Sequence, residues 1–140
     1  MIFIRETVEK DLASVIGLLQ CLSSFVPKKN DYPYIWEAFN EQKNLHSVVA
    51  TLEEEVVGYG SVLIETKIRG GKAGHIEDVV SHQMYRGMGI GKALMDALYM
   101  IAEENECYKV TLQCREQNRV FYKKCGYANS GITMQKFLKK

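Results

Sequence analysis

The sequence predicts a single α/β domain over residues 1–140, in which β-strands and amphipathic helices share one core. Its 140 residues suffice for one hydrophobic core and are too few for two. Segments that alternate apolar and polar residues, typical of strands, are interspersed with segments of helical spacing. With 46% hydrophobic residues, two prolines and a net charge of +1, the composition is globular and argues against a nucleic-acid partner.

The first residues carry no targeting signal. Met1–Glu6 leads directly into a strand-like run and lacks the charged and then apolar pattern of a signal peptide. No apolar stretch approaches the ~20 residues that span a bilayer. We therefore expect a soluble, cytoplasmic protein with no membrane partner.

The cysteines and histidines predict no metal site. The four cysteines form no CxxC pair and have no histidine cluster nearby, and the three histidines are scattered along the chain. We expect reduced and mostly buried thiols, with Cys107, Cys114 and Cys125 as packing residues.

Strand and helix signals alternate along the first half of the chain. Apolar residues recur at helical spacing after Asp11, a helix start signal. Two β-branched runs flank three glutamates, which predicts a hairpin with a charged turn. The predicted elements are a strand at Ile2–Arg5, a helix over residues 12–22, a loop at Phe25–Pro33, a helix at Tyr34–Lys43 and hairpin strands at His46–Leu52 and Val56–Ile64.

The second half places a glycine-rich loop between a strand and a helix. That helix carries Leu94, Leu98 and Ile101 on one apolar stripe. The predicted elements are a strand at His75–Val80, the loop Arg86–Gly91, a helix at Lys92–Glu104, a strand at Tyr108–Cys114, a short helix from about Asn118 to Gly126 and a strand-like tail at Ile132–Leu138.

The loop Arg86–Gly91 has the composition of an anion-binding turn. Glycines let the backbone approach a ligand, and the free amides of the following helix attract phosphate oxygens. A nucleoside-triphosphate loop is excluded because Arg86 stands at its first glycine and Ala93 replaces its hydroxyl residue. The dinucleotide pattern lacks its third glycine, since Lys92 or Leu94 stands there. A plain chain-reversing turn remains the alternative.

Two motifs of the chain resemble those of the GNAT N-acetyltransferase superfamily. The loop matches the pattern R/Q-x-x-G-x-G/A, and Asn118–Tyr127 is similar to a second signature that contains a tyrosine. The resemblance implies that backbone amides of the loop grip the pyrophosphate of coenzyme A and that Tyr122 lies beside its sulfur. It therefore implies acetyl-CoA as co-substrate, and a single N-acetyltransferase domain.

Three longer strings resemble one family of that superfamily, the glucosamine 6-phosphate N-acetyltransferases. They are Gly74–Val80, Cys107–Leu112 and Phe121–Tyr127, and the likeness is weaker before about Ile64. It implies the acyl-CoA N-acyltransferase fold, with a mixed, largely antiparallel sheet flanked by helices. It also implies acetyl transfer to the amine of D-glucosamine 6-phosphate in UDP-N-acetylglucosamine biosynthesis, by a homodimer whose partner helps complete the sugar site.

The resemblance assigns residues to both ligands. The coenzyme residues it implies are Val79, Val80, Ser81, Arg86, Gly87, Met88, Gly89, Ile90, Gly91, Asn118, Tyr122, Lys123 and Lys124. The acceptor residues it implies are Ser23, Lys67, Ile68, Arg69, Gly70, Glu77, Asp78, Val79, Tyr108, Lys109, Gln113 and Lys136. Two of these depart from the family, since relatives carry an acidic residue at Gln113 and arginine at Lys136.

Two side chains are candidates for catalysis. An ammonium cannot attack a thioester, so a base must take its proton, and Glu77 is the candidate. Tyr122 is placed by the resemblance to help the leaving thiolate. A backbone amide near Val79 is the candidate donor to the oxyanion. The alternatives are a solvated or ion-paired carboxylate at Glu77 and a core tyrosine at Tyr122.

Lysines and arginines from separate segments are candidates for the sugar phosphate. Lys67, Arg69, Lys109 and Lys136 fit that role together, whereas each alone fits a solvated surface position. Two rival functions stay open. One is an acetyltransferase of the same superfamily acting on another small amine or a peptide, and the other is a non-catalytic CoA-binding module.

Overall fold

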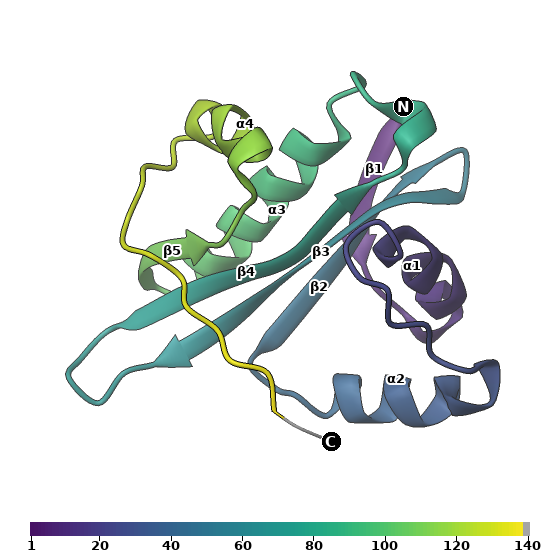
Figure 1. The fold of residues 1–140 in the computed structure, drawn as a ribbon, viewed down its shortest axis with the longest axis horizontal. Helices are drawn as coiled ribbons and strands as arrows, with labels where there is room; N and C mark the ends of the chain where they lie inside the picture. The colour runs from purple at the N-terminus through teal and green to yellow at the C-terminus, as the bar shows by residue number, and fades with distance from the viewer. Residues whose placement is uncertain (139–140) are drawn as a thin grey trace.

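Five β-strands form one mixed sheet in the computed structural model, which describes residues 1–138 (Figure 1). The strands are β1 (Ile2–Glu6), β2 (Leu45–Leu52), β3 (Glu55–Thr66), β4 (Lys72–Ser81) and β5 (Cys107–Leu112), in that spatial order. The three pairings from β1 to β4 are antiparallel, and β4 pairs with β5 in parallel. The predicted mixed, largely antiparallel sheet is confirmed.

Four α-helices flank this sheet. They are α1 (Leu12–Leu19), α2 (Tyr32–Asn40), α3 (Ile90–Glu104) and α4 (Arg119–Lys124), with short 3-10 turns before each of α1, α2 and α4 and between β4 and α3. All four predicted helices are present with shifted ends. The second begins earlier than predicted because Pro33 fits the first turn of a helix. Within residues 1–138 the structure contains no helix with the length and apolar character that membrane spanning requires.

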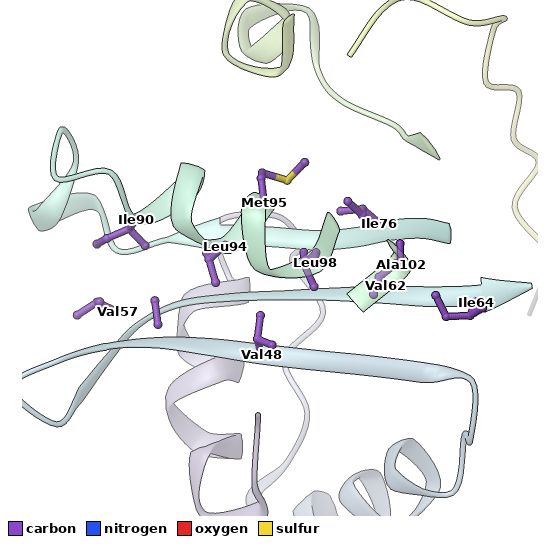
Figure 2. Packing of buried hydrophobic residues seen from close by; sticks show 11 residues of the cluster. Val48, Val57, Val62, Ile64, Ile76, Ile90, Leu94, Met95, Leu98 and Ala102 are labelled. Carbon is purple, nitrogen blue, oxygen red and sulfur yellow. The ribbon is translucent and has the colours of Figure 1, made fainter. Parts of the chain in front are cut away.

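Helix α3 supplies the larger core. Its buried Leu94 and Leu98 pack against Val48, Val62 and Ile76 of the sheet (Figure 2). The other sheet face carries α1, whose Val15 and Leu18 join Val49, Tyr59 and Val80 in a second cluster. The sheet is therefore covered on both faces, and the ends of its strands are left for a site.

Close approach of α3 depends on small residues in β3. A Cβ atom at Gly60 would lie 2.9 Å from Leu98 Cδ1, and one at Gly58 would lie 2.7 Å from Ile90 Cγ2. Both distances are shorter than real Cβ contacts, so these two glycines bring the start and middle of α3 onto the sheet.

Strand β4 separates from β5 halfway along its length. The β4–β5 ladder ends at the pair Ile76 and Leu112, whereas β4 continues to Ser81. On its other edge the register with β3 shifts by one residue, and Asp78 takes a φ of 54° there. This bulge turns the strand away from β5, so the sheet is splayed beside Glu77–Ser81.

Three expectations about the C-terminal region and the thiols were wrong. Residues 132–138 are not a strand but an extended, exposed segment, because no strand of the described chain pairs with them. Strand β5 ends at Leu112, so Gln113 and Cys114 lie beyond it, where β4 has already diverged. Cys21 and Cys114 are exposed, whereas Cys107 and Cys125 do pack against the α3 cluster.

Candidate active site

The glycine loop lies between the end of β4 and the start of α3. Gly87 and Gly89 have φ angles of 85° and 81°, and no atom lies within 4 Å of a Cβ built at either residue. Gly89 is the N-cap of α3 and carries no side-chain cap. The amide of Ala93 donates to Gly89 O over 3.0 Å, so the three amides before it have no helical acceptor. The loop therefore presents free N–H groups at the positive end of a helix.

Gly91 has a different role from the other two loop glycines. Its φ is not in the left-handed region, but a Cβ atom there would lie 3.1 Å from Cζ of Phe121. Phe121 belongs to α4, which carries the second motif. The two motifs thus touch through Gly91 and Phe121.

Tyr122 is half-buried on α4. It packs against the α3 cluster and lines a cavity of about 410 Å³ between β5, α4 and the following segment. Burial raises the pKa of its phenol, and the thiols of Cys114 and Cys125 add to that rise. The hydroxyl therefore stays protonated through the neutral range and is available as a proton donor.

The carboxylates Glu77 and Asp78 sit at the bulge of β4. Both are exposed, and among residues 1–138 the Glu77 carboxylate has neither a hydrogen bond nor an ion pair. The hydroxyl of Ser61 donates to the backbone oxygen of Glu77 over 3.1 Å. On the neighbouring strand β3, Tyr59 pairs with Val80, and burial is the main reason that its pKa is raised to about 12. The backbone of the bulge is therefore hydrogen-bonded to β3, while the Glu77 side chain faces solvent.

Asp78 and Ser23 line one cavity of about 190 Å³. Its other walls come from α1 and the loop after it, and they are mainly apolar. The hydroxyl of Ser23 accepts a hydrogen bond from the Phe25 amide over 3.0 Å, which fixes the loop beside Asp78. Two predicted acceptor residues that are far apart in sequence thus lie together.

A group of cations gathers where β3 turns into β4. Lys67 Nζ donates to Glu65 Oε1 over 2.9 Å, and His75 Nε2 lies 2.8 Å from the same oxygen. Interaction with Arg69 lowers the pKa of the Tyr108 phenol. Ile68 and Gly70 complete the turn.

Lys109 belongs to the same end of the sheet. Its Nζ lies 5.6 Å from the centroid of the Tyr108 ring. Four predicted acceptor residues, Lys67, Arg69, Tyr108 and Lys109, therefore gather beside this turn.

Other predicted residues stand apart from these groups. Lys136 lies in the exposed tail, and Gln113 lines the cavity of Tyr122 and Lys123 rather than joining Lys109. Asn118 and Lys124 are exposed at the two ends of α4, and Asn118 makes no side-chain cap. Among residues 1–138 no group of three His, Cys, Asp or Glu side chains is placed to hold a metal ion.

Several residues near these groups were not predicted. They are Phe121, Tyr59, Ser61, Glu65 and His75. Phe121 stands next to Tyr122 in the second motif, so that motif was a signal for it. The other four contribute through cross-strand register, which periodicity does not specify.

A comparison with protein-family models gives a result that agrees with the fold and the loop. The acetyltransferase (GNAT) family model matches residues 14–127, which include the loop, Tyr122 and the bulge. The chain belongs to this family.

Individual relatives narrow the resemblance. A glucosamine 6-phosphate N-acetyltransferase of Dictyostelium discoideum is 32% identical over 87% of this chain and 83% of its own length. One from Arabidopsis thaliana is 45% identical, and the match spans 64% of each chain, slightly less than two thirds. The crystal structure of glucosamine-6-phosphate N-acetyltransferase from Arabidopsis thaliana superposes with a TM-score of 0.91 at 33% identity over 99% of both chains.

Proposed function

We propose that residues 1–140 form one acetyltransferase domain that moves the acetyl group of acetyl-CoA to the amine of D-glucosamine 6-phosphate. The observation that carries the proposal is the contact between the two motifs. The free amides of α3 and the Tyr122 phenol belong to elements joined by Gly91 and Phe121. The identity of the acceptor is taken from the names of the relatives described above.

Acetyl-CoA is the donor in this proposal. The amides at the start of α3 bind its pyrophosphate, and Arg86 and Lys123 add positive charge nearby. The β4 segment Val79–Ser81 runs along the splayed side of the sheet, where the β4–β5 ladder has ended. Its backbone groups are thus available to the pantetheine chain and to the thioester carbonyl.

The chemistry needs three proton movements. Glu77 takes a proton from the acceptor ammonium, directly or through water, and the freed amine attacks the thioester carbon. The amide of Val79 is the proposed donor to the oxyanion of the tetrahedral intermediate. As the carbon–sulfur bond breaks, Tyr122 gives its proton to the departing thiolate. The nitrogen of the intermediate loses its second proton to solvent, and the Tyr122 phenolate recovers a proton from solvent.

The acceptor is proposed to lie between the carboxylates of one chain and the cations of another. The resemblance implies a homodimer, and the proposed arrangement follows it. A second copy brings its own Lys67 and Arg69 to this Glu77 and holds the 6-phosphate.

The exposed tail also supports a homodimer. Ile132, Met134, Phe137 and Leu138 are each more than 80% exposed. Apolar side chains gathered on a short segment are typical of an interaction surface. The cytoplasmic location and the place in UDP-N-acetylglucosamine biosynthesis stay predictions.

Turnover across a panel of amines tests the function. Thiol release from acetyl-CoA is measured with glucosamine 6-phosphate, glucosamine, a small amine and a peptide. We expect the phosphosugar to be the best acceptor by at least about tenfold, since its phosphate forms charge-assisted hydrogen bonds. A better peptide or amine would transfer the assignment to another acetyltransferase, and coenzyme binding without any release would indicate a binding module.

Mixed dimers test the shared site. A Lys67→Ala plus Arg69→Ala chain and a Glu77→Gln chain are co-expressed with different tags, and the mixed dimer is purified. If each site takes Glu77 from one chain and the cations from the other, one of its two sites is intact, and activity returns to about half. A mixed dimer whose activity is only the mean of its two parents' activities would place all these residues in one chain's site.

A further inference from the structure

The ring of Phe121 occupies the space that a side chain at Gly91 would fill. A Cβ atom there would lie 3.1 Å from Cζ, 3.5 Å from Cε1 and 3.8 Å from Cε2 of that ring. The first distance is tighter than ordinary Cβ contacts, so any larger residue would move the ring by a few tenths of an ångström. Because the backbone of Gly91 is not left-handed, chain conformation does not require glycine here.

The same ring also touches the proposed proton donor. The Phe121 and Tyr122 ring centroids are 5.0 Å apart, with an interplanar angle of 75°. Tyr122 in turn meets Tyr127 edge to face at 6.4 Å. The Tyr127 amide donates a hydrogen bond to the backbone oxygen of Tyr122 over 3.0 Å, at the C-terminal end of α4. The first turn of α3, Phe121 and Tyr122 therefore form one continuous series of contacts.

We propose that Phe121, seated on Gly91, is a positioning residue that fixes Tyr122 relative to the coenzyme loop. This role rests on the proposed function, because it assumes that Tyr122 protonates the leaving thiolate. Gly91 then serves the chemical step through the ring, in addition to the amide that it offers at the start of α3, whereas Gly87 and Gly89 serve coenzyme binding alone.

Gly91→Ala tests the proposal, with Gly17→Ala as its matched control. Gly17 is also a helical glycine, and a Cβ atom there meets no atom within 4 Å. We expect Gly91→Ala to lower kcat about threefold to thirtyfold and to change KM for acetyl-CoA less than about threefold, because a small displacement of a catalytic group slows the chemical step. Gly17→Ala should leave both constants within about twofold.

Two further backgrounds make the test specific. In a Phe121→Ala protein, and separately in a Tyr122→Phe protein, Gly91→Ala should cost no further kcat, since the ring or the hydroxyl it displaces is gone. The changes in melting temperature caused by the Gly91 and Phe121 substitutions should also be non-additive in the double variant. This measurement requires no activity.

The contrary outcomes are distinct. A Gly91→Ala protein with native kcat and a raised KM, equal in all backgrounds, would overturn the proposal and leave Gly91 as a pyrophosphate residue. An unmutated protein without acetyl transfer would overturn the proposed function instead, and this role of Phe121 with it.

Discussion

The two ends of the central sheet build their parts of the site in different ways. At the α3 end, glycines, a helix start and a phenol from α4 are brought together within one chain. At the β3–β4 turn, cationic side chains gather around Tyr108, one of them already paired with Glu65. The α3 end is made largely of backbone amides, whereas the turn end is made of side chains.

This difference has a consequence for assembly. Backbone amides at a helix start point outward wherever the helix forms, so one chain would supply these amides to the proposed coenzyme site. Side-chain cations on a surface turn need an anion brought to them, and in the proposed homodimer the Glu77 that completes the site belongs to the other chain. We therefore expect variants at the α3 end to act within a subunit and variants at the turn end to act across subunits.

The largest effect is expected at the α3 end, from Tyr122→Phe. Loss of a donor used as charge develops on sulfur should lower kcat about tenfold to a thousandfold, with little change in KM for acetyl-CoA. Because burial raises the pKa of Tyr122, the protonated donor persists as pH rises, and the basic limb of the native profile should lie at a higher pH than the ionisation of an ordinary tyrosine. Steady-state kinetics across pH measure both the loss of kcat and the position of the basic limb. Tyr99→Phe, at an exposed tyrosine of α3, is the control. Unchanged turnover would remove Tyr122 from the chemistry.

The next effect concerns coenzyme binding by the same end. Gly89→Val places a branched side chain at a φ of 81° beside the amides, and should raise the coenzyme dissociation constant about tenfold or more. Gly70→Val is the control, since Gly70 also has a left-handed φ, of 108°, but lies in the turn at the opposite end of β4 from the loop. Calorimetric titration of both folded variants with acetyl-CoA measures the two dissociation constants. Native affinity in Gly89→Val would contradict the placement of the pyrophosphate.

A smaller effect is expected at the turn end. Lys67→Ala with Arg69→Ala should narrow the preference for glucosamine 6-phosphate over glucosamine by about tenfold, because charge-assisted hydrogen bonds to phosphate are lost. The coenzyme constant should not change. Lys10→Ala with Lys43→Ala removes the same charge from exposed positions and controls for net charge. Should the preference stay at its native value, the phosphate site lies elsewhere.

The smallest effect tests the packing behind Tyr122. Among residues 1–138 the buried Tyr127 hydroxyl has no hydrogen-bond partner, and burial raises the pKa of that phenol to about 12. Tyr127→Phe removes an unsatisfied polar atom and keeps the ring, so stability should rise by up to about 1 kcal/mol. Thermal unfolding measures this change. A fall in melting temperature would mean that the hydroxyl makes a stabilising hydrogen bond in solution.

The sequence alone determined the order of the elements and the position of the glycine loop. Alternation, helical spacing and glycine composition are local properties, so the strands, the helices and the loop Arg86–Gly91 were predictable within a few residues. The two motifs also identified Tyr122 as a candidate.

Tertiary structure decided how these parts meet. The bulge at Asp78, the end of β5 at Leu112 and the seat of Phe121 on Gly91 follow from cross-strand register and from side-chain packing between distant segments. The tail was predicted as a strand from its composition, yet a strand needs a partner, and none of the described strands pairs with it. Local sequence specifies what a segment can form, and the neighbours available to its backbone and side chains decide what it does form.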